Sequence, residues 1–190
     1  MSGCNDILLG SNPSCAAIKK PGGVKKRIWI GLKSEISGYT RNGGTDDIET
    51  ISMAMNGSIP YTLKKFISKR DKINVQFPAV IGENVVTYNH QVSTPVFYST
   101  TQELNNLEVL MSSEEVFVIV EGNDEKLMVL GIKEGMKASA GEGGLGVLVN
   151  DNTAYNITLA GEQTELPKYF NISTSATLAQ NIAYLDAISE

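Results

Sequence analysis

The sequence predicts a mainly β fold, a sandwich or barrel of strands with one α-helix on its flank. Short segments that alternate apolar and polar residues recur along most of the 190-residue chain, as half-buried strands require. Leucines and isoleucines take helical spacing only in residues 100–111 and 173–190. Apolar residues make up 42% and charged residues 19% of the chain, which is typical of a globular protein.

Alternation predicts about eight strands in total. They cover Arg27–Leu32, Ile48–Met55, Ile59–Ile67, Lys72–Val80, Glu83–Ser99, Glu115–Gly122, Lys126–Ile132 and Ala154–Glu162. The longest, Glu83–Ser99, places His90 and Val92 on its apolar face, and its Pro95 predicts a sheet edge or a bulge. Asn42-Gly43 and Asn56-Gly57 are hairpin signals, the first inside a turn-rich loop over Ser37–Asp47.

Thr100 and Glu103 form a capping-box pattern at the start of the inserted helix. A second amphipathic helix is expected at the C-terminus, where Leu178, Ile182 and Leu185 form one stripe; it packs either on its own domain or on another subunit. We therefore divide the chain into an N-terminal arm, residues 1–24, a β domain, residues 25–170, and a C-terminal helix or extension, residues 171–190.

The stretch "KASAGEGGLGVLVNDN" (Lys137–Asn152) carries the spacing G-x-G-x-x-G, which in another context binds a dinucleotide. That site needs a helix directly after the last glycine, yet Gly146 is followed by β-prone Val147–Val149 and a turn cluster. The context therefore argues against nucleotide binding. Two interpretations remain for Lys137–Gly146: a flexible loop that joins two strands, or a loop that folds against a neighbouring copy.

The pattern predicts no catalytic, cofactor or metal site. The single histidine, His90, is expected in or near the core with a hydrogen-bond partner, and Trp29 is expected in the core. Cys4 and Cys15 fit a reducing compartment, with a disulfide possible but not required. No apolar run is long enough to span a membrane, and the first residues do not resemble a signal peptide.

Charge is distributed unevenly. Residues 1–100 hold 12 Lys and Arg against 7 Asp and Glu, whereas residues 101–190 hold 4 against 14. The basic run Lys19–Arg27 is either a solvated segment that leads into the first strand or one end of a polar molecule whose copies attract head to tail. It lacks interleaved aromatic residues, which makes nucleic-acid binding the weaker interpretation.

Several motifs in a fixed order carry a family resemblance. "NPSCAAIKKPGGVKKRIWIG", "VFVIVEGND..LMVLGI", "ASAGEGGLGVLVNDNTAYNITLAGE" and "LPKYF" together resemble virion proteins of phages that infect Bacteroidota, including crAss-like phages. The resemblance spans most of residues 10–170. Such proteins are tail-tube-like or ring-forming proteins of the tail, set below the portal.

The resemblance implies a tail-tube-like β-sandwich or barrel that forms a hollow ring of six or twelve copies. Hairpins and termini would reach adjacent copies or neighbouring tail rings, and double-stranded DNA would pass through an acidic lumen without specific binding. The implied inter-subunit residues are Lys137, Gly141, Gly143, Gly144 and Gly146 in the glycine stretch, Asn42, Gly43 and Gly44 in the turn-rich loop, and Lys19, Lys20, Lys25 and Lys26 near the N-terminus.

We therefore expect a structural, non-enzymatic protein of the virion tail that is made in the host cytoplasm. A repeating tail-tube protein is the alternative within the same class. A β-sandwich that binds carbohydrate or a host surface is the second hypothesis, and its mark would be an exposed aromatic cluster. A hydrolase that uses His90 is the third.

Overall fold

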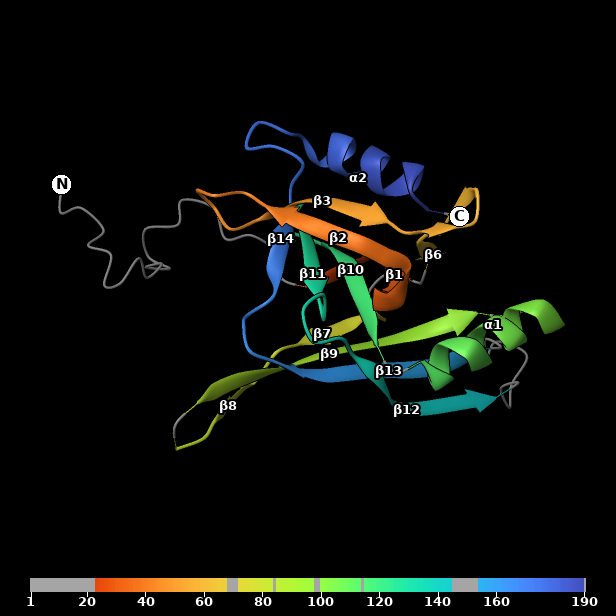
Figure 1. Cartoon of the computed structure of the whole chain (residues 1–190). Helices are drawn as coiled ribbons and strands as arrows, with labels where there is room; N and C mark the ends of the chain where they lie inside the picture. The colour runs from red at the N-terminus through yellow and green to blue at the C-terminus, as the bar shows by residue number, and fades with distance from the viewer. Residues whose placement is uncertain are drawn as a thin grey trace.

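The computed structural model describes residues 23–67, 72–83, 85–97, 100–113, 115–144 and 154–189. Most of the predicted N-terminal arm, residues 1–22, thus lies outside the described residues. Within them the chain is mainly β, as predicted, with two α-helices (Figure 1). The strands are β1 (Val24–Leu32), β2 (Ile36–Arg41), β3 (Ile48–Met53), β4 (Met55–Asn56), β5 (Ile59–Pro60), β6 (Lys64–Ile67), β7 (Asn74–Gln76), β8 (Ala79–Ile81), β9 (Val86–Phe97), β10 (Val116–Gly122), β11 (Leu127–Leu130), β12 (Lys137–Gly144), β13 (Ala154–Gln163) and β14 (Lys168–Phe170).

The larger sheet has the order β2-β3-β14-β11-β10-β1-β6. Its centre is β10, whose residues Val116–Glu121 are all buried. A continuous run of β-branched and aromatic residues suits a strand that is covered on both faces. Antiparallel pairing sets Trp29 of β1 opposite Ile119 of β10, and the β10–β11 hairpin forms as the sequence predicts.

The smaller sheet has the order β12-β13-β9-β7, and β8 also pairs with β9. Strand β9 follows the predicted alternation: His90, Val92, Thr94 and Val96 are buried, whereas the residues between them are less so. At Pro95 the strand pairs with β13 on one side, and on the other side the described pairing ends at Ser93. Pro95 therefore lies at a local edge of the sheet, as predicted.

Three layers result (Figure 1). A first apolar cluster lies between the two sheets and joins Ile28 and Val118 of the larger sheet to Val92 and Ile157 of the smaller one. A second cluster covers the opposite face of the larger sheet and includes Trp29, Phe117, Ile119, Phe170, Ile182 and Leu185. Neither sheet closes on itself within the described residues, so a closed barrel is not formed there.

Helix α1 (Thr101–Ser112) begins with the predicted capping box, in which Thr100 Oγ1 accepts the N–H of Glu103 and the Glu103 carboxylate accepts the N–H of Thr100. Its buried Leu107 and Leu110 face the cluster between the sheets. Helix α2 (Leu178–Ala187) buries Ile182 and Leu185 in the second cluster of the same chain. Of the two predicted placements of the C-terminal helix, the structure therefore has the one on its own domain.

The number of strands differs from the expected eight because turns divide several alternating segments. Asn56-Gly57 makes a short hairpin of β4 and β5, and Phe77-Pro78 separates β7 from β8. Ser37–Arg41, predicted as the first part of a loop, belongs to β2. Thr40 lies opposite Thr50 of β3, and their hydroxyl oxygens are 2.7 Å apart. Cross-strand pairing thus extends a segment whose local composition favours a turn.

Candidate assembly surfaces

The glycine stretch forms an edge strand. Lys137–Gly144 is β12, paired with β13, so the loop expected over Lys137–Gly146 is wrong for these residues; Gly146 lies outside the described residues. A Cβ at Gly141 would lie 2.7 Å from the Tyr155 ring and 2.6 Å from the Met111 methyl of α1. The glycines therefore leave room for two neighbouring side chains to lie against the strand. The apolar–polar alternation in the sequence did not predict strand β12, because glycine has no side chain that could alternate between the two faces.

Both ends of the smaller sheet present strands with one partner. Among the described residues, β12 pairs only with β13, while β7 and β8 pair only with β9. Such edges carry backbone N–H and C=O groups that can pair with a strand of another chain. Lys137, Gly141 and Gly143, predicted as contact residues, lie on one of these edges and are exposed; Gly144 is there too, though its exposure is not described.

The hairpin formed by β8 and the start of β9 projects from the body of the molecule (Figure 1). Its apolar side chains face solvent: Val80 is 49% exposed, Ile81 81%, Val85 59% and Val86 44%. Sequence reasoning missed this surface. The available signal was consecutive apolar residues on both sides of Gly82-Glu83, because a strand with one buried face alternates instead.

The β2–β3 turn confirms the Asn42-Gly43 hairpin signal. Asn42 Oδ1 accepts the N–H of Gly44 at 2.8 Å and that of Thr45 at 3.1 Å, and Asn42 Nδ2 donates to Glu49 at 2.6 Å. Asn42 therefore shapes the turn from within. Gly43 and Gly44 are exposed at its tip, and a Cβ on Gly43 would meet nothing within 4 Å. A neighbouring molecule could reach the turn there.

Ion pairs hold this turn against the segment before β14. Arg41 donates to Glu165 at 2.6 Å and 2.9 Å, and Lys168 pairs with Asp46. The hydrogen bond from Arg41 holds the pKa of Glu165 below its ordinary value of 4.5, and it raises the pKa of Arg41 in turn. The Lys168 ammonium lowers the pKa of Asp46. The turn carries fixed, paired charges.

Lys25, predicted as an inter-subunit residue, makes an ion pair within its own chain. Its ammonium lies 3.2 Å from Glu121, and Arg27 Nε lies 2.7 Å from the same carboxylate, whose side chain is 1% exposed. Two cations thus neutralise a buried anion on β10. Lys19 and Lys20 lie outside the described residues, and so does the side chain of Lys26.

The uneven charge of the sequence is partly balanced within one chain. Cations of residues 1–100 pair with carboxylates of residues 101–190 in the contacts Lys25 and Arg27 with Glu121, Lys33 with Glu115, Arg41 with Glu165, and Lys65 with Asp186. These charges are already satisfied in the monomer. They give no support to the interpretation of head-to-tail attraction between copies.

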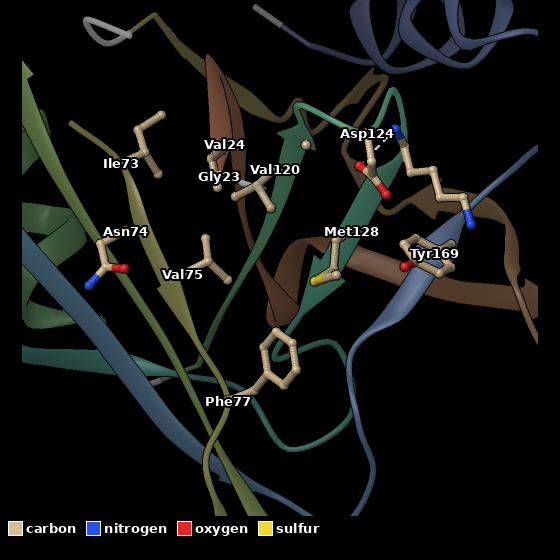
Figure 2. A pocket seen from close by; sticks show the side chains of 12 residues that line it. Gly23, Val24, Ile73, Asn74, Val75, Phe77, Val120, Asp124, Met128 and Tyr169 are labelled. Carbon is tan, nitrogen blue, oxygen red and sulfur yellow. Dashed lines mark hydrogen bonds between the residues drawn. The ribbon is translucent and has the colours of Figure 1, made fainter. Parts of the chain in front are cut away.

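A groove of about 510 Å³ opens between the two sheets at the N-terminal end of β1 (Figure 2). Figure 2 shows Ile73, Asn74 and Val75 on one wall and Met128 and Tyr169 on the other. The remaining lining residues are Gly23, Val24, Phe77, Val120, Gly122, Asp124 and Lys126. The lining is thus mainly apolar, and Asn74, Asp124 and Lys126 are polar or charged members of it.

His90 confirms the expectation of a buried, hydrogen-bonded histidine. It is 3% exposed; Nδ1 accepts the N–H of Gly131 at 3.2 Å, so Nε2 carries the proton and donates to the carbonyl oxygen of Glu165 at 3.0 Å. Burial lowers the pKa of His90 below 6.5, and the Glu165 carbonyl and the nearby Glu134 and Glu165 carboxylates oppose this. Backbone groups engage both ring nitrogens, so His90 ties β9 to two other segments of the chain.

Within the described part of the chain, no three His, Cys, Asp or Glu side chains are grouped as metal ligands. Neither described helix has the length and apolar composition that crossing a bilayer requires. Comparison of the chain with protein-family models, with curated proteins and with solved structures found no match.

Proposed function

We propose that this chain is a structural phage virion protein whose copies form a ring of the tail, and that the ring is part of the conduit for the genome. The observation that carries the proposal is the projecting β8–β9 hairpin with its exposed apolar residues. Soluble proteins seldom leave such a cluster on a protruding element unless another surface covers it. The motif resemblance to virion proteins of Bacteroidota phages points the same way.

The proposed assembly is head to tail. The smaller sheet ends in β12 on one side and in β7 and β8 on the other, so an edge of one copy can meet the opposite edge of the next. A repeated contact of this kind closes into a ring when its rotation divides a full turn, here into six or twelve copies. The hairpin would then lie on the adjacent copy, and a stable contact buries about 1,200–2,000 Å² in total.

The tail-tube-like description of the fold belongs to this proposal. Two stacked sheets with α1 on one flank are compatible with a tail-tube-like fold. The layer formed by α2 is an addition to that fold. The net charge of −5 suits a conduit, because a negative wall repels DNA phosphates and the genome slides without sticking. We expect the protein in the virion tail, beside other tail rings or portal-proximal proteins.

One observation favours a second candidate, a carbohydrate-binding or host-surface-binding module. Phe77 and Tyr169, far apart in the sequence, are 40% and 36% exposed and both line the groove. Aromatic faces are common platforms for ligands. The Lys126 ammonium, however, already lies 4.3 Å from the centroid of the Tyr169 ring. Saturable binding on a glycan array that is lost in Phe77→Ala would favour this candidate.

The deciding measurement is the mass of the purified protein by light scattering over a range of concentration, followed by negative-stain microscopy of any large species. Closed rings of six or twelve copies are expected, either from the protein alone or after addition of portal and neighbouring tail proteins. Long stacked tubes would favour the repeating tail-tube alternative. A protein that stays monomeric alone and with those partners would overturn the proposal.

A further inference from the structure

We propose that Asn56 is a site of spontaneous covalent modification, at which the side-chain amide is lost and aspartate or isoaspartate takes its place. The chain has two Asn-Gly pairs, Asn42-Gly43 and Asn56-Gly57, and the structure places them in different surroundings. The inference goes beyond the proposed function and does not depend on it, because it concerns the covalent chemistry of a single chain.

The reaction needs only the asparagine, the residue after it and water. The backbone nitrogen of Gly57 attacks Cγ of Asn56, and the new C–N bond closes a five-membered imide. The bond from Cγ to the side-chain nitrogen breaks, and this nitrogen leaves as ammonia with the proton of the Gly57 N–H. Water then opens the imide at either carbonyl, and nothing is oxidised or reduced. Glycine suits the second position because it has no side chain to obstruct the attack.

The first argument is the freedom of the Asn56 carboxamide. Asn56 ends β4 and lies opposite Ile59 across a two-residue hairpin, and residues 55–60 are all exposed. Within the described residues neither the Asn56 side chain nor the Gly57 N–H makes a hydrogen bond. A Cβ on Gly57 would meet nothing within 4 Å, so the imide has room to form. The carboxamide can therefore turn toward the Gly57 nitrogen without breaking a contact.

The second argument is the contrast with Asn42. Its Oδ1 accepts two backbone N–H groups at 2.8 and 3.1 Å, and its Nδ2 donates to Glu49 at 2.6 Å. The Gly43 N–H also has no partner within the described residues, so the two pairs differ in the carboxamide and not in the attacking nitrogen. To react, Asn42 has to give up hydrogen bonds that Asn56 does not make, which raises the barrier.

The third argument is the place of the hairpin in the fold. Strands β4 and β5 form a two-stranded sheet of their own, and Met55 and Ile59 are 59% and 72% exposed. Isoaspartate adds one carbon to the backbone at position 56, which disturbs the pairing with Ile59. Either product adds a carboxylate, so the net charge of −5 becomes −6. The modification therefore opens a peripheral hairpin while both apolar clusters stay packed.

The test compares the two Asn-Gly pairs within one sample of the full chain. The protein is kept at mildly alkaline pH, and peptide mapping by mass spectrometry measures the conversion of each asparagine. In the folded protein we expect Asn56 to convert at least about tenfold faster than Asn42. In denaturant the hydrogen bonds of Asn42 are lost, and the two should convert at similar rates. A ratio of rates that is the same in the folded and the unfolded protein would overturn the proposal.

Matched variants assign the reaction to its residues. Asn56→Gln should remove most of the acidic species that grows on ion-exchange chromatography, because glutamine closes a larger ring much more slowly. Asn42→Gln is the matched control and should leave that growth unchanged. Glu49→Ala removes the acceptor of Asn42 Nδ2 and should speed conversion at Asn42 without affecting Asn56. Growth of the acidic species at its original rate in Asn56→Gln would also overturn the proposal.

Discussion

Gly143 lies directly opposite Tyr155 across the β12–β13 ladder, and the Tyr155 ring occupies the space where a Cβ of residue 143 would stand. Gly141, two residues earlier, faces the same ring and the end of α1. The glycines of this stretch therefore serve packing between neighbouring elements of one chain. Any contact that β12 makes with another copy has to use the backbone edge or the opposite face.

Replacing Gly143 tests this relationship. Gly143→Ala should lower the free energy of unfolding by about 1–3 kcal/mol, because the added methyl forces the Tyr155 ring to move. Gly38→Ala in β2 is the control, since a Cβ there meets nothing within 4 Å, and it should cost less. Urea denaturation measures both. If Gly143→Ala costs as much in a Tyr155→Ala background as in the wild type, the close approach is not the reason.

The Trp29–Asp186 contact joins the core of the larger sheet to α2. Trp29 Nε1–H donates to Asp186 at 3.1 Å, and Lys65 pairs with the same carboxylate. Asp186→Ala should destabilise the protein by about 1–3 kcal/mol, because the indole N–H of a fully buried Trp29 loses its acceptor. Asp186→Asn keeps an acceptor and should cost less. Trp29 is the only tryptophan, so its fluorescence reports on this site during unfolding. Equal losses in the two variants would contradict the assignment.

The buried Glu121 predicts a strong effect of removing its cation. Arg27→Ala should cost about 2–3 kcal/mol, which is below the range for a fully buried pair because Lys25 remains as a second partner. Lys33→Ala is the comparison, because its partner Glu115 is 60% exposed, and it should cost under about 1 kcal/mol. Denaturation curves of the two variants at equal ionic strength measure both losses of unfolding free energy. Equal losses in Arg27→Ala and Lys33→Ala would contradict the strong effect expected at Glu121.

Stability should fall as the pH is lowered from about 7 to 5. The folded state holds the pKa of His90 below 6.5, so near and below that value the unfolded chain binds more protons than the folded one. The contribution is complete above the unfolded pKa and is lost as the pH falls through this window. His90→Gln should flatten the slope between these pH values. The pKa values of Asp46 and Glu165 are also lowered, from 3.8 and 4.5. Their contribution to stability is lost at more acidic pH, below these ordinary values, and is therefore separate from that of His90.

The projecting hairpin predicts a separation of assembly from stability. Ile81→Ser should leave the free energy of unfolding within about 0.5 kcal/mol, since a largely exposed side chain adds little to the fold. It should reduce ring formation in light scattering and microscopy. Ile59→Ser on the β4–β5 hairpin is equally conservative, and its side chain is 72% exposed. Equal loss of rings in both variants would remove the special role of the β8–β9 hairpin.

Several elements could be predicted because local sequence determines them. The alternation of β9, the Thr100–Glu103 capping box, the β10–β11 hairpin and the stripe of α2 all depend on residues within one segment. The burial of Trp29 and His90 followed from the same patterns. Local periodicity is therefore a good guide where one face of an element is buried.

The features that were missed depend on partners far away in the chain. Strand β12 is recognisable only with Tyr155 of β13, and the ion pairs of Arg41 and Lys25 join segments that the sequence separates widely. The groove combines residues near positions 24, 75 and 128 with Tyr169. Tertiary contacts of this kind leave no local signature, so the candidate surfaces required the structure.

The position of β10 in the chain has a consequence for folding during synthesis. Strand β1 pairs with β10, and both apolar clusters draw residues from these two strands. At about 5–20 residues per second of synthesis, β1 waits on the order of ten seconds for its partner to emerge. During that time Ile28 and Trp29 can pair only with β6, and the central strand of the sheet is missing. The topology therefore implies slow, late and cooperative folding of all three layers, with a nascent chain that benefits from chaperone protection until β10 has been made.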